Sequence, residues 1–240
     1  MIEGQTQSSD ESRTSPHKRG AHARLDCRAG ISTESIIAAC LDSVDDSKSM
    51  LEFLKLKVRA VIGVALSIEV EECCIRGVLA KKVMVLVEDS TLDISKPYDW
   101  LLHWLEQFLP NSKVPKQTLD AWSELSSVWE RVYGKRPIDC LLSFVKILCA
   151  FLAVEFLGIT TISCSPLPLG DGIGQSPLIA RLLIGMPTFV SNDGVVDPAA
   201  AVLLRILTEN GRVATCQDAF VASFVGAGAE ESGTMCRLMT

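Results

Sequence analysis

Apolar residues recur along this chain with two different periods, which predict helices in some segments and strands in others. Spacings of three and four residues are typical of helices, and runs rich in Val and Ile are typical of strands. The predicted helices are 33–42, 49–58, 98–109, 117–132, 138–157 and 198–208, and the predicted strands are 23–27, 61–70, 82–88 and 159–164. This mixture indicates a mixed α/β fold, a single domain of short strands and packed helices whose sheet order the sequence does not specify.

Capping residues mark the ends of several predicted helices. Ser32 or Thr33 can accept the free N–H groups at the start of helix 33–42. Asp197, followed by Pro198, is typical of a helix start, and Gly158 is typical of a residue just past a helix end.

The longest apolar stretch, 138–157, reads IDCLLSFVKILCAFLAVEFL and has nearly the length of a membrane span. Lys146 and Glu155 interrupt it, and each would be costly in hydrocarbon. We therefore predict a core helix of a protein without a membrane association. A small membrane-associated protein built on this stretch is the alternative.

Residues 1–23 are polar and rich in Ser, which predicts a disordered tail. Glu3, Asp10 and Glu11 argue against a mitochondrial leader. The rest of the chain is apolar enough for a core, because 48% of the 240 residues are hydrophobic and 22% are charged. A net charge of −6 argues against a nucleic-acid partner, since phosphate binding needs a surplus of Lys and Arg.

Nine cysteines are present, an odd number with no C-x-x-C pair. We therefore expect reduced thiols and a cytoplasmic location, because several cysteines fall in apolar runs and the adjacent Cys73 and Cys74 cannot easily close a disulfide. A thiolate metal site remains the alternative. The three histidines, His17, His22 and His103, share no local motif.

A loop rich in Pro and Gly follows the strand at 159–164 and reads SPLPLGDGIG. Ser165, Gly170, Gly172 and Gly174 are candidate cofactor-binding residues, because glycines after a strand let backbone amides approach an anion. A turn between core elements is the alternative, since the loop lacks the Lys-Ser/Thr of a phosphate loop.

Four segments in the same order resemble motifs of the nickel-pincer-cofactor nickel-insertion protein family (LarC). Residues 25–42 resemble its first signature, D-C-F-S-G-I-S-G-D-M, and residues 165–170 match its S-P-L-P-L-G letter for letter. Residues 197–204 are similar to its T-P-T-G-A-A-L-L, and residues 225–238 follow its G-x-G-A/T…N-x-L-R-L pattern. The resemblance covers most of the chain from Leu25 to Leu238.

The resemblance implies an activity and a domain plan. Family members insert nickel into a pyridinium bis-thiocarboxylate mononucleotide, in a CTP-dependent reaction that gives the cofactor of lactate racemase. Residues 24–224 would then form the N-terminal domain and residues 225–240 the beginning of the C-terminal domain. The resemblance further implies an absent CTP site, a mononucleotide substrate and a separate protein that carries the C-terminal domain.

Family positions also imply metal ligands, of which Asp26, Glu34 and Asp139 remain. Asp139 matches the first aspartate of the family's H-E-V-G-A-V-D-x-x-x-D motif, and Ser143 takes the place of its last aspartate. The histidine and the glutamate of the motif are absent here. Glu34 stands for the aspartate of S-G-D, and Asp197 for the first threonine of T-P-T-G. The lost histidines predict either a degenerate nickel-insertion protein with weak nickel binding or a catalytically inactive relative that acts as a binding or interaction module.

Overall fold

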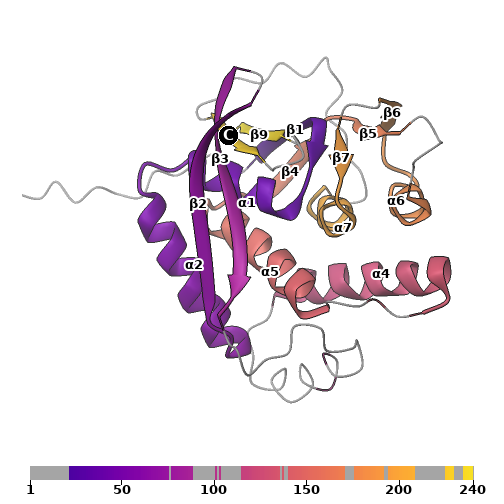
Figure 1. The fold of residues 1–240 in the computed structure, drawn as a ribbon, viewed down its shortest axis with the longest axis horizontal. Helices are drawn as coiled ribbons and strands as arrows, with labels where there is room; N and C mark the ends of the chain where they lie inside the picture. Colours follow the sequence, from indigo (N-terminus) through magenta and orange to yellow (C-terminus); the bar gives the residue numbers. More distant parts are fainter. Residues whose placement is uncertain are drawn as a thin grey trace, which may run out of the picture.

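A mixed sheet of seven strands forms the centre of the fold in the computed structural model (Figure 1). The structure describes residues 22–75, 77–88, 101, 103, 115–135, 137, 140–170, 176–191, 194–208, 225–229 and 235–239. The strand order is β2-β3-β8-β9-β1-β4, and β7 pairs with the carboxyl end of β1. The strands are β1 (His22–Ile31), β2 (Leu66–Ile75), β3 (Val78–Val87), β4 (Thr161–Cys164), β7 (Val195–Val196), β8 (Val225–Ala229) and β9 (Met235–Met239). The predicted mixed α/β class is confirmed.

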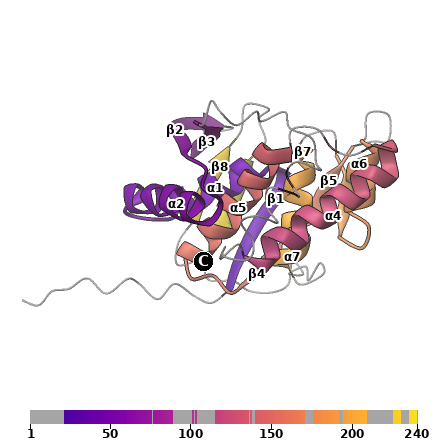
Figure 2. The same cartoon turned by 90° about the horizontal axis from the view of Figure 1, so that it is seen from below.

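Six helices and a small second sheet complete the described fold. The helices are α1 (Thr33–Asp42), α2 (Ser47–Ile62), α4 (Lys116–Tyr133), α5 (Cys140–Phe156), α6 (Pro177–Leu182) and α7 (Pro198–Leu207). The small parallel sheet pairs β5 (Leu167–Leu169) with β6 (Thr188–Val190). Helix α5 lies between α1 and α4 in both views (Figures 1 and 2).

Helix α1 lies directly on the sheet, and two glycines make this possible. A Cβ at Gly226 would collide with the carbonyl oxygen of Ala39, and one at Gly228 with that of Ser35. The start of α1 is fixed by Ser32, whose hydroxyl accepts the N–H of Ser35 in a reciprocal capping box. The predicted cap at Ser32 is thus confirmed, and the carboxyl end of β1 leads into a rigid helix start.

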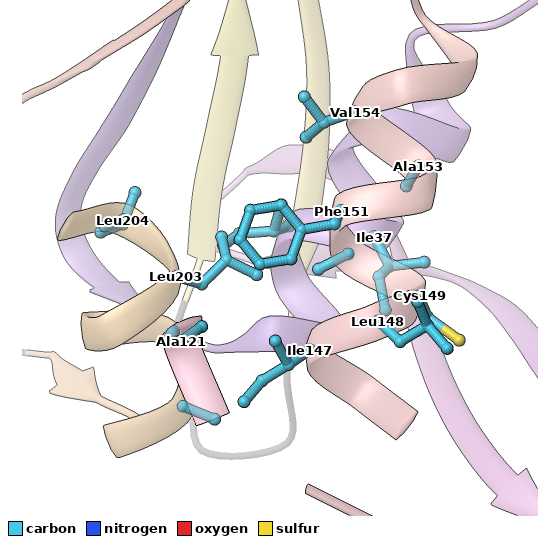
Figure 3. Packing of buried hydrophobic residues seen from close by; sticks show 14 of the residues in the cluster. Ile37, Ala121, Ile147, Leu148, Cys149, Phe151, Ala153, Val154, Leu203 and Leu204 are labelled. Carbon is cyan, nitrogen blue, oxygen red and sulfur yellow. The ribbon is translucent and has the colours of Figure 1, made fainter. Parts of the chain in front are cut away.

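Helix α5 is the core helix predicted from the apolar run. Its side chains share one cluster with α1 and α7, in which Figure 3 shows Ile37, Phe151 and Leu203. The structure ends α5 at Phe156, and Gly158 follows in a left-handed conformation with a φ of 65°. Within the described residues, every helix falls short of the length and hydropathy that a bilayer span requires.

The predicted strand 61–70 is wrong in its first part. Val61 and Ile62 continue the buried face of α2, and Gly63, with a φ of 70°, ends that helix before β2 begins at Leu66. Strand β2 runs on through Cys73 and Cys74, and these two form no disulfide among the described residues. Residues 1–21 and most of the predicted helix 98–109 lie outside the described residues.

The C-terminal segment belongs to the main sheet. Residues 225–240, expected to begin a further domain, supply β8 and β9 between β3 and β1. Strand β8 is parallel to β3, and β9 is antiparallel to both β8 and β1. Asp42 accepts the N–H of Ala227 at 2.9 Å and lies 3.8 Å from the Lys81 ammonium, which ties the end of α1 to these strands.

Candidate functional site: an acidic groove at the carboxyl ends of β1 and β7

Two helices begin at the same edge of the sheet, where β1 and β7 end side by side. The strands are parallel, with Ile31 opposite Val196, and the N–H of Asp197 donates to the carbonyl of Ile31 at 2.9 Å. Because β1 leads into α1 and β7 into α7, the free N–H groups of both helices face this edge. Helix N-termini at strand ends favour negative charge.

Asp197 places its carboxylate between these two helix starts. It caps α7 by accepting the N–H of Ala200 at 3.3 Å, and it lies 3.5 Å from the hydroxyl of Thr33 in α1. Burial raises the pKa of Asp197 above its ordinary value, although backbone N–H groups and the charge of Lys146 act in the opposite direction. The carboxyl therefore binds a proton more readily than an ordinary aspartate does.

Glu34 and Lys146 form the second polar pair of the edge. The Lys146 ammonium lies 2.8 Å from a carboxylate oxygen of Glu34, and their side chains are only 23% and 12% exposed. Lys146 comes from the middle of the apolar helix α5 and lines a cavity beside α1. Glu34 and Asp197 line the same cavity, which we call the acidic groove after these two carboxylates.

The acidic groove has room for a small organic molecule. Its volume is about 720 Å³, within the range of ligand pockets. One wall is apolar and comes from 83–86 of β3, with Leu142 and Val195 beside it, and Ser143 adds a hydroxyl. Lys82 also lines the groove, and its ammonium lies 3.7 Å from the Glu71 carboxylate, so the lining holds two lysines beside its two carboxylates. The groove could therefore hold a molecule with a flat apolar part and a charged or metal-binding end.

The two predicted metal ligands that the structure describes, Asp26 and Glu34, line different pockets. Asp26 lies in a separate pocket of β1 and β9, where the Arg28 guanidinium bonds it at 2.7 Å and Arg237 lies 3.8 Å away. The hydrogen bond from Arg28 holds the pKa of Asp26 below its ordinary value. Asp139 lies outside the described residues, among which no group of three His, Cys, Asp or Glu side chains could hold a metal ion.

The predicted cofactor loop has a structural anchor at its start. The hydroxyl of buried Ser165 accepts the N–H of Cys27 at 2.8 Å, and the N–H of Ser165 donates to the carbonyl of Leu25 at 2.8 Å. Gly170 is exposed, with nothing within 4 Å of the position of a Cβ. Gly172 and Gly174 lie outside the described residues, so their role stays a prediction.

Sequence reasoning placed Lys146 and Asp197 correctly but missed them as site residues. Lys146 was an interruption of an apolar run, and Asp197 was a helix cap. The available signal was a single cation inside the core helix, because a buried charge needs a partner or an opening. Glu34 was identified from the sequence, and it is the predicted metal residue that the structure places in the acidic groove.

These features define a mixed α/β protein with a candidate site at the carboxyl ends of parallel strands. The profile of the family described as "Nickel insertion protein" matches residues 23–237, and the chain belongs to this family. It is 26% identical over 233 residues to a curated protein named for nickel insertion from Geotalea uraniireducens, covering 88% of this chain and 57% of that relative. A relative of the same name from Syntrophobacter fumaroxidans is 28% identical over 211 residues, which cover 78% of this chain and 51% of that relative.

Another relative of the same name, from Geobacter metallireducens, is 26% identical, and the match covers 55% of its length. The chain thus spans about half the length of the curated relatives it matches. No solved structure is significantly similar to the chain. The acidic groove joins segments that lie far apart in the sequence but all fall within the family match, namely the start of α1, the middle of α5 and the start of α7.

Proposed function

We propose that this chain binds the organic substrate of a nickel-insertion reaction in the acidic groove, and that this substrate is the pyridinium mononucleotide that becomes the nickel-pincer cofactor of lactate racemase. The observation that carries the proposal is the convergence of Glu34, Lys146 and Asp197 on one cavity with an apolar wall. A pyridinium ring is flat and positively charged, so it suits carboxylates beside Val83 and Val85. The Lys146 ammonium would face the anionic groups of the substrate.

Nickel is a substrate of this reaction, and the described lining of the acidic groove contains no His or Cys to bind it, only carboxylate and hydroxyl oxygens beside two lysines. Nickel prefers sites where imidazole, thiolate and carboxylate ligands converge. Glu34 is already paired with Lys146, and Asp197 is tied to two helix starts. We therefore expect the chain alone to bind nickel with a dissociation constant above about 10 μM. Nickel insertion would then require a partner protein that carries the CTP site.

Substrate binding is tested by titrating the chain with nicotinamide mononucleotide, a pyridinium mononucleotide, and following the heat released. Glu34→Gln and Asp197→Asn each remove one negative charge from the groove and should weaken binding about fivefold to tenfold. Glu69→Gln is the matched control, because Glu69 is exposed on β2 and does not line the groove. If all three variants bind the mononucleotide as tightly as the wild type does, the acidic groove is excluded as the substrate site.

Nickel binding is tested by calorimetric titration after removal of any purification tag. Lys146→Met frees Glu34 and should strengthen nickel binding severalfold, because the carboxylate no longer has a competing ammonium. Lys48→Met, at the exposed start of α2, is the control and should leave it unchanged. A stoichiometric submicromolar site that disappears in Asp139→Ala would contradict weak nickel binding by the chain.

A catalytically inactive relative that acts as a binding or interaction module is the second candidate. The ion pair of Glu34 with Lys146 favours this candidate, because the ammonium of the chain already occupies the position beside the carboxylate that a metal ion would take. The two candidates differ in one measurement, the incorporation of nickel into the mononucleotide in the presence of CTP and a partner domain. Incorporation that depends on Glu34 supports the first candidate, and binding without incorporation supports the second.

A further inference from the structure

Three arginines gather in a pocket between α4, α6 and α7, which lie next to one another in both views (Figures 1 and 2). The pocket has a volume of about 540 Å³ and shares no lining residue with the acidic groove. Arg131 comes from the last turn of α4, Arg181 from α6 and Arg205 from α7. We call it the arginine pocket.

Arg205 is held in place by the chain itself. Its guanidinium lies 3.2 Å from the Glu124 carboxylate and donates to the carbonyls of Leu182 and Ile184 at 3.3 and 3.5 Å. These bonds join α7 to α4 and to the end of α6, so they fix the back of the pocket. Arg205 therefore has a structural role and is not free to bind a ligand.

Arg131 and Arg181 remain open to a ligand. Arg131 donates to the hydroxyl of Ser127 at 2.7 Å, and neither arginine has an acidic partner among the described residues. Both side chains are exposed at the mouth of the pocket. Since Glu124 is the one acidic residue of the described lining, two positive charges are left without compensation. Such an excess in a cavity attracts an anion.

The arginine pocket also offers an apolar surface. Val128 and Val132 of α4 line it, and Ile184 beside them is 59% exposed, which is unusual for a large aliphatic side chain. Paired guanidinium groups recognise phosphate oxygens with two hydrogen bonds each, and an aliphatic surface suits a flat ring. A small molecule with a phosphate group and a ring satisfies both halves of the pocket.

We propose that the arginine pocket binds a small organic phosphate, with the phosphoryl group between Arg131 and Arg181 and the ring against Val128 and Ile184. The site is separate from the acidic groove, so it stands whether or not nickel insertion is the reaction of this chain. It gives the protein a second small-molecule site, one whose described lining has an excess of positive charge.

The proposal is tested by calorimetric titration of the whole chain with adenosine 5′-monophosphate and with adenosine at low salt. We expect the monophosphate to bind at least about tenfold more tightly than adenosine, because charge-assisted hydrogen bonds supply the difference. Uridine 5′-monophosphate should bind within about threefold of the adenine nucleotide, since an aliphatic surface does not read base edges.

Arg131→Gln and Arg181→Gln should each weaken binding of the monophosphate about tenfold. Both residues are exposed, so we expect the melting temperature of each variant without ligand to stay close to that of the wild type. Arg59→Gln, at the exposed end of α2, is the control and should bind as the wild type does. Adenosine binding as tightly as the monophosphate, no binding at about 5 mM, or unchanged binding by both pocket variants would each overturn the proposal.

Discussion

Two aspartates lie along strand β1 and beside its carboxyl end, and they have opposite environments. Asp26, in the middle of the strand, is bonded by Arg28 and approached by Arg237, so its pKa is lowered. Asp197, beside the carboxyl end, is desolvated between two helix starts, so its pKa is raised. Both are aspartates on the same sheet, and their neighbours alone account for the difference.

The comparison separates a structural acid from one that is available for chemistry. Asp26 is neutralised by two cations of its own chain, which leaves little attraction for a ligand. Asp197 lines a cavity in which Lys146 lies near both it and Glu34, and Lys82 lines the same cavity. A carboxyl pKa raised by burial in a cleft is typical of functional sites, whereas a pKa lowered by an ion pair is also common in structural networks. The resemblance of Asp26 to a family motif position is therefore not by itself sufficient to identify it as a metal ligand.

The largest expected effect comes from moving α1, which carries one side of the acidic groove. Gly228→Ala places a methyl group against the carbonyl oxygen of Ser35, so α1 must shift away from β8. We expect a loss of about 3 kcal/mol in the free energy of unfolding, measured by denaturant titration, because backbone cannot yield as a side chain can.

Gly170→Ala is the control for this prediction, since nothing lies within 4 Å of the added carbon and its backbone has an ordinary φ. We expect a change below about 0.5 kcal/mol there. Equal stability of both variants would mean that the contact of α1 with β8 does not hold the acidic groove in place.

The sequence predicted the helices of this fold better than its sheet. Segments such as 138–157 carry a local signal, a long apolar run followed by Gly158, and the structure confirms the helix over Cys140–Phe156. The positions of β8 and β9 between β3 and β1 depend on contacts between residues about 200 apart, which no local pattern contains. The glycines of β8 were visible in the sequence, but their reason, the close approach of α1, is tertiary.

The acidic groove was predictable in part for the same reason. Glu34 follows a recognisable helix cap and a family motif, so the sequence identified it. Lys146 and Asp197 lie 112 and 163 positions further along the chain, and only the packing of α5 and α7 on α1 brings them beside it. The metal role of Asp26 stays a prediction, and the structure adds that a neighbour two residues away, Arg28, forms an ion pair with it.

A smaller effect is expected at Asp197, where charge and capping can be separated. Asp197→Ala removes the cap of α7 and should lower the free energy of unfolding by about 1 kcal/mol at pH 7. Asp197→Asn keeps a capping oxygen and removes the buried charge, so it should equal or exceed the wild type in stability at pH 7.

The pH dependence follows from the raised pKa of Asp197. Below its ordinary value of 3.8 the carboxyl is protonated in both the folded and the unfolded state, so the asparagine variant has no advantage. The advantage appears as the pH rises from there through the folded-state pKa, because the folded wild type then holds a buried charge. An asparagine variant that is less stable than the wild type at pH 7 and equal to it at pH 3 would show that the charge of Asp197 stabilises the fold.

The smallest effect is expected at Asp26, and it has the opposite sign. Asp26→Asn loses the ion pair with Arg28, a residue whose side chain is 67% exposed, so solvent screening limits the loss to about 0.5–1 kcal/mol at pH 7. The folded-state pKa of Asp26 is lowered, so its stabilising contribution is fully present above the ordinary value of 3.8 and is lost as the pH falls through the folded-state value.

Denaturant titrations of the wild type and of Asp26→Asn test this prediction. The variant should be less stable than the wild type at pH 7, and the difference should be smaller at about pH 2.5. Raising the salt concentration to about 1 M should reduce the difference at pH 7 as well, because exposed charges are screened. A stability difference that does not change with pH or salt would mean that the side chain of Asp26 acts through packing, and the contrast between Asp26 and Asp197 would then not be electrostatic.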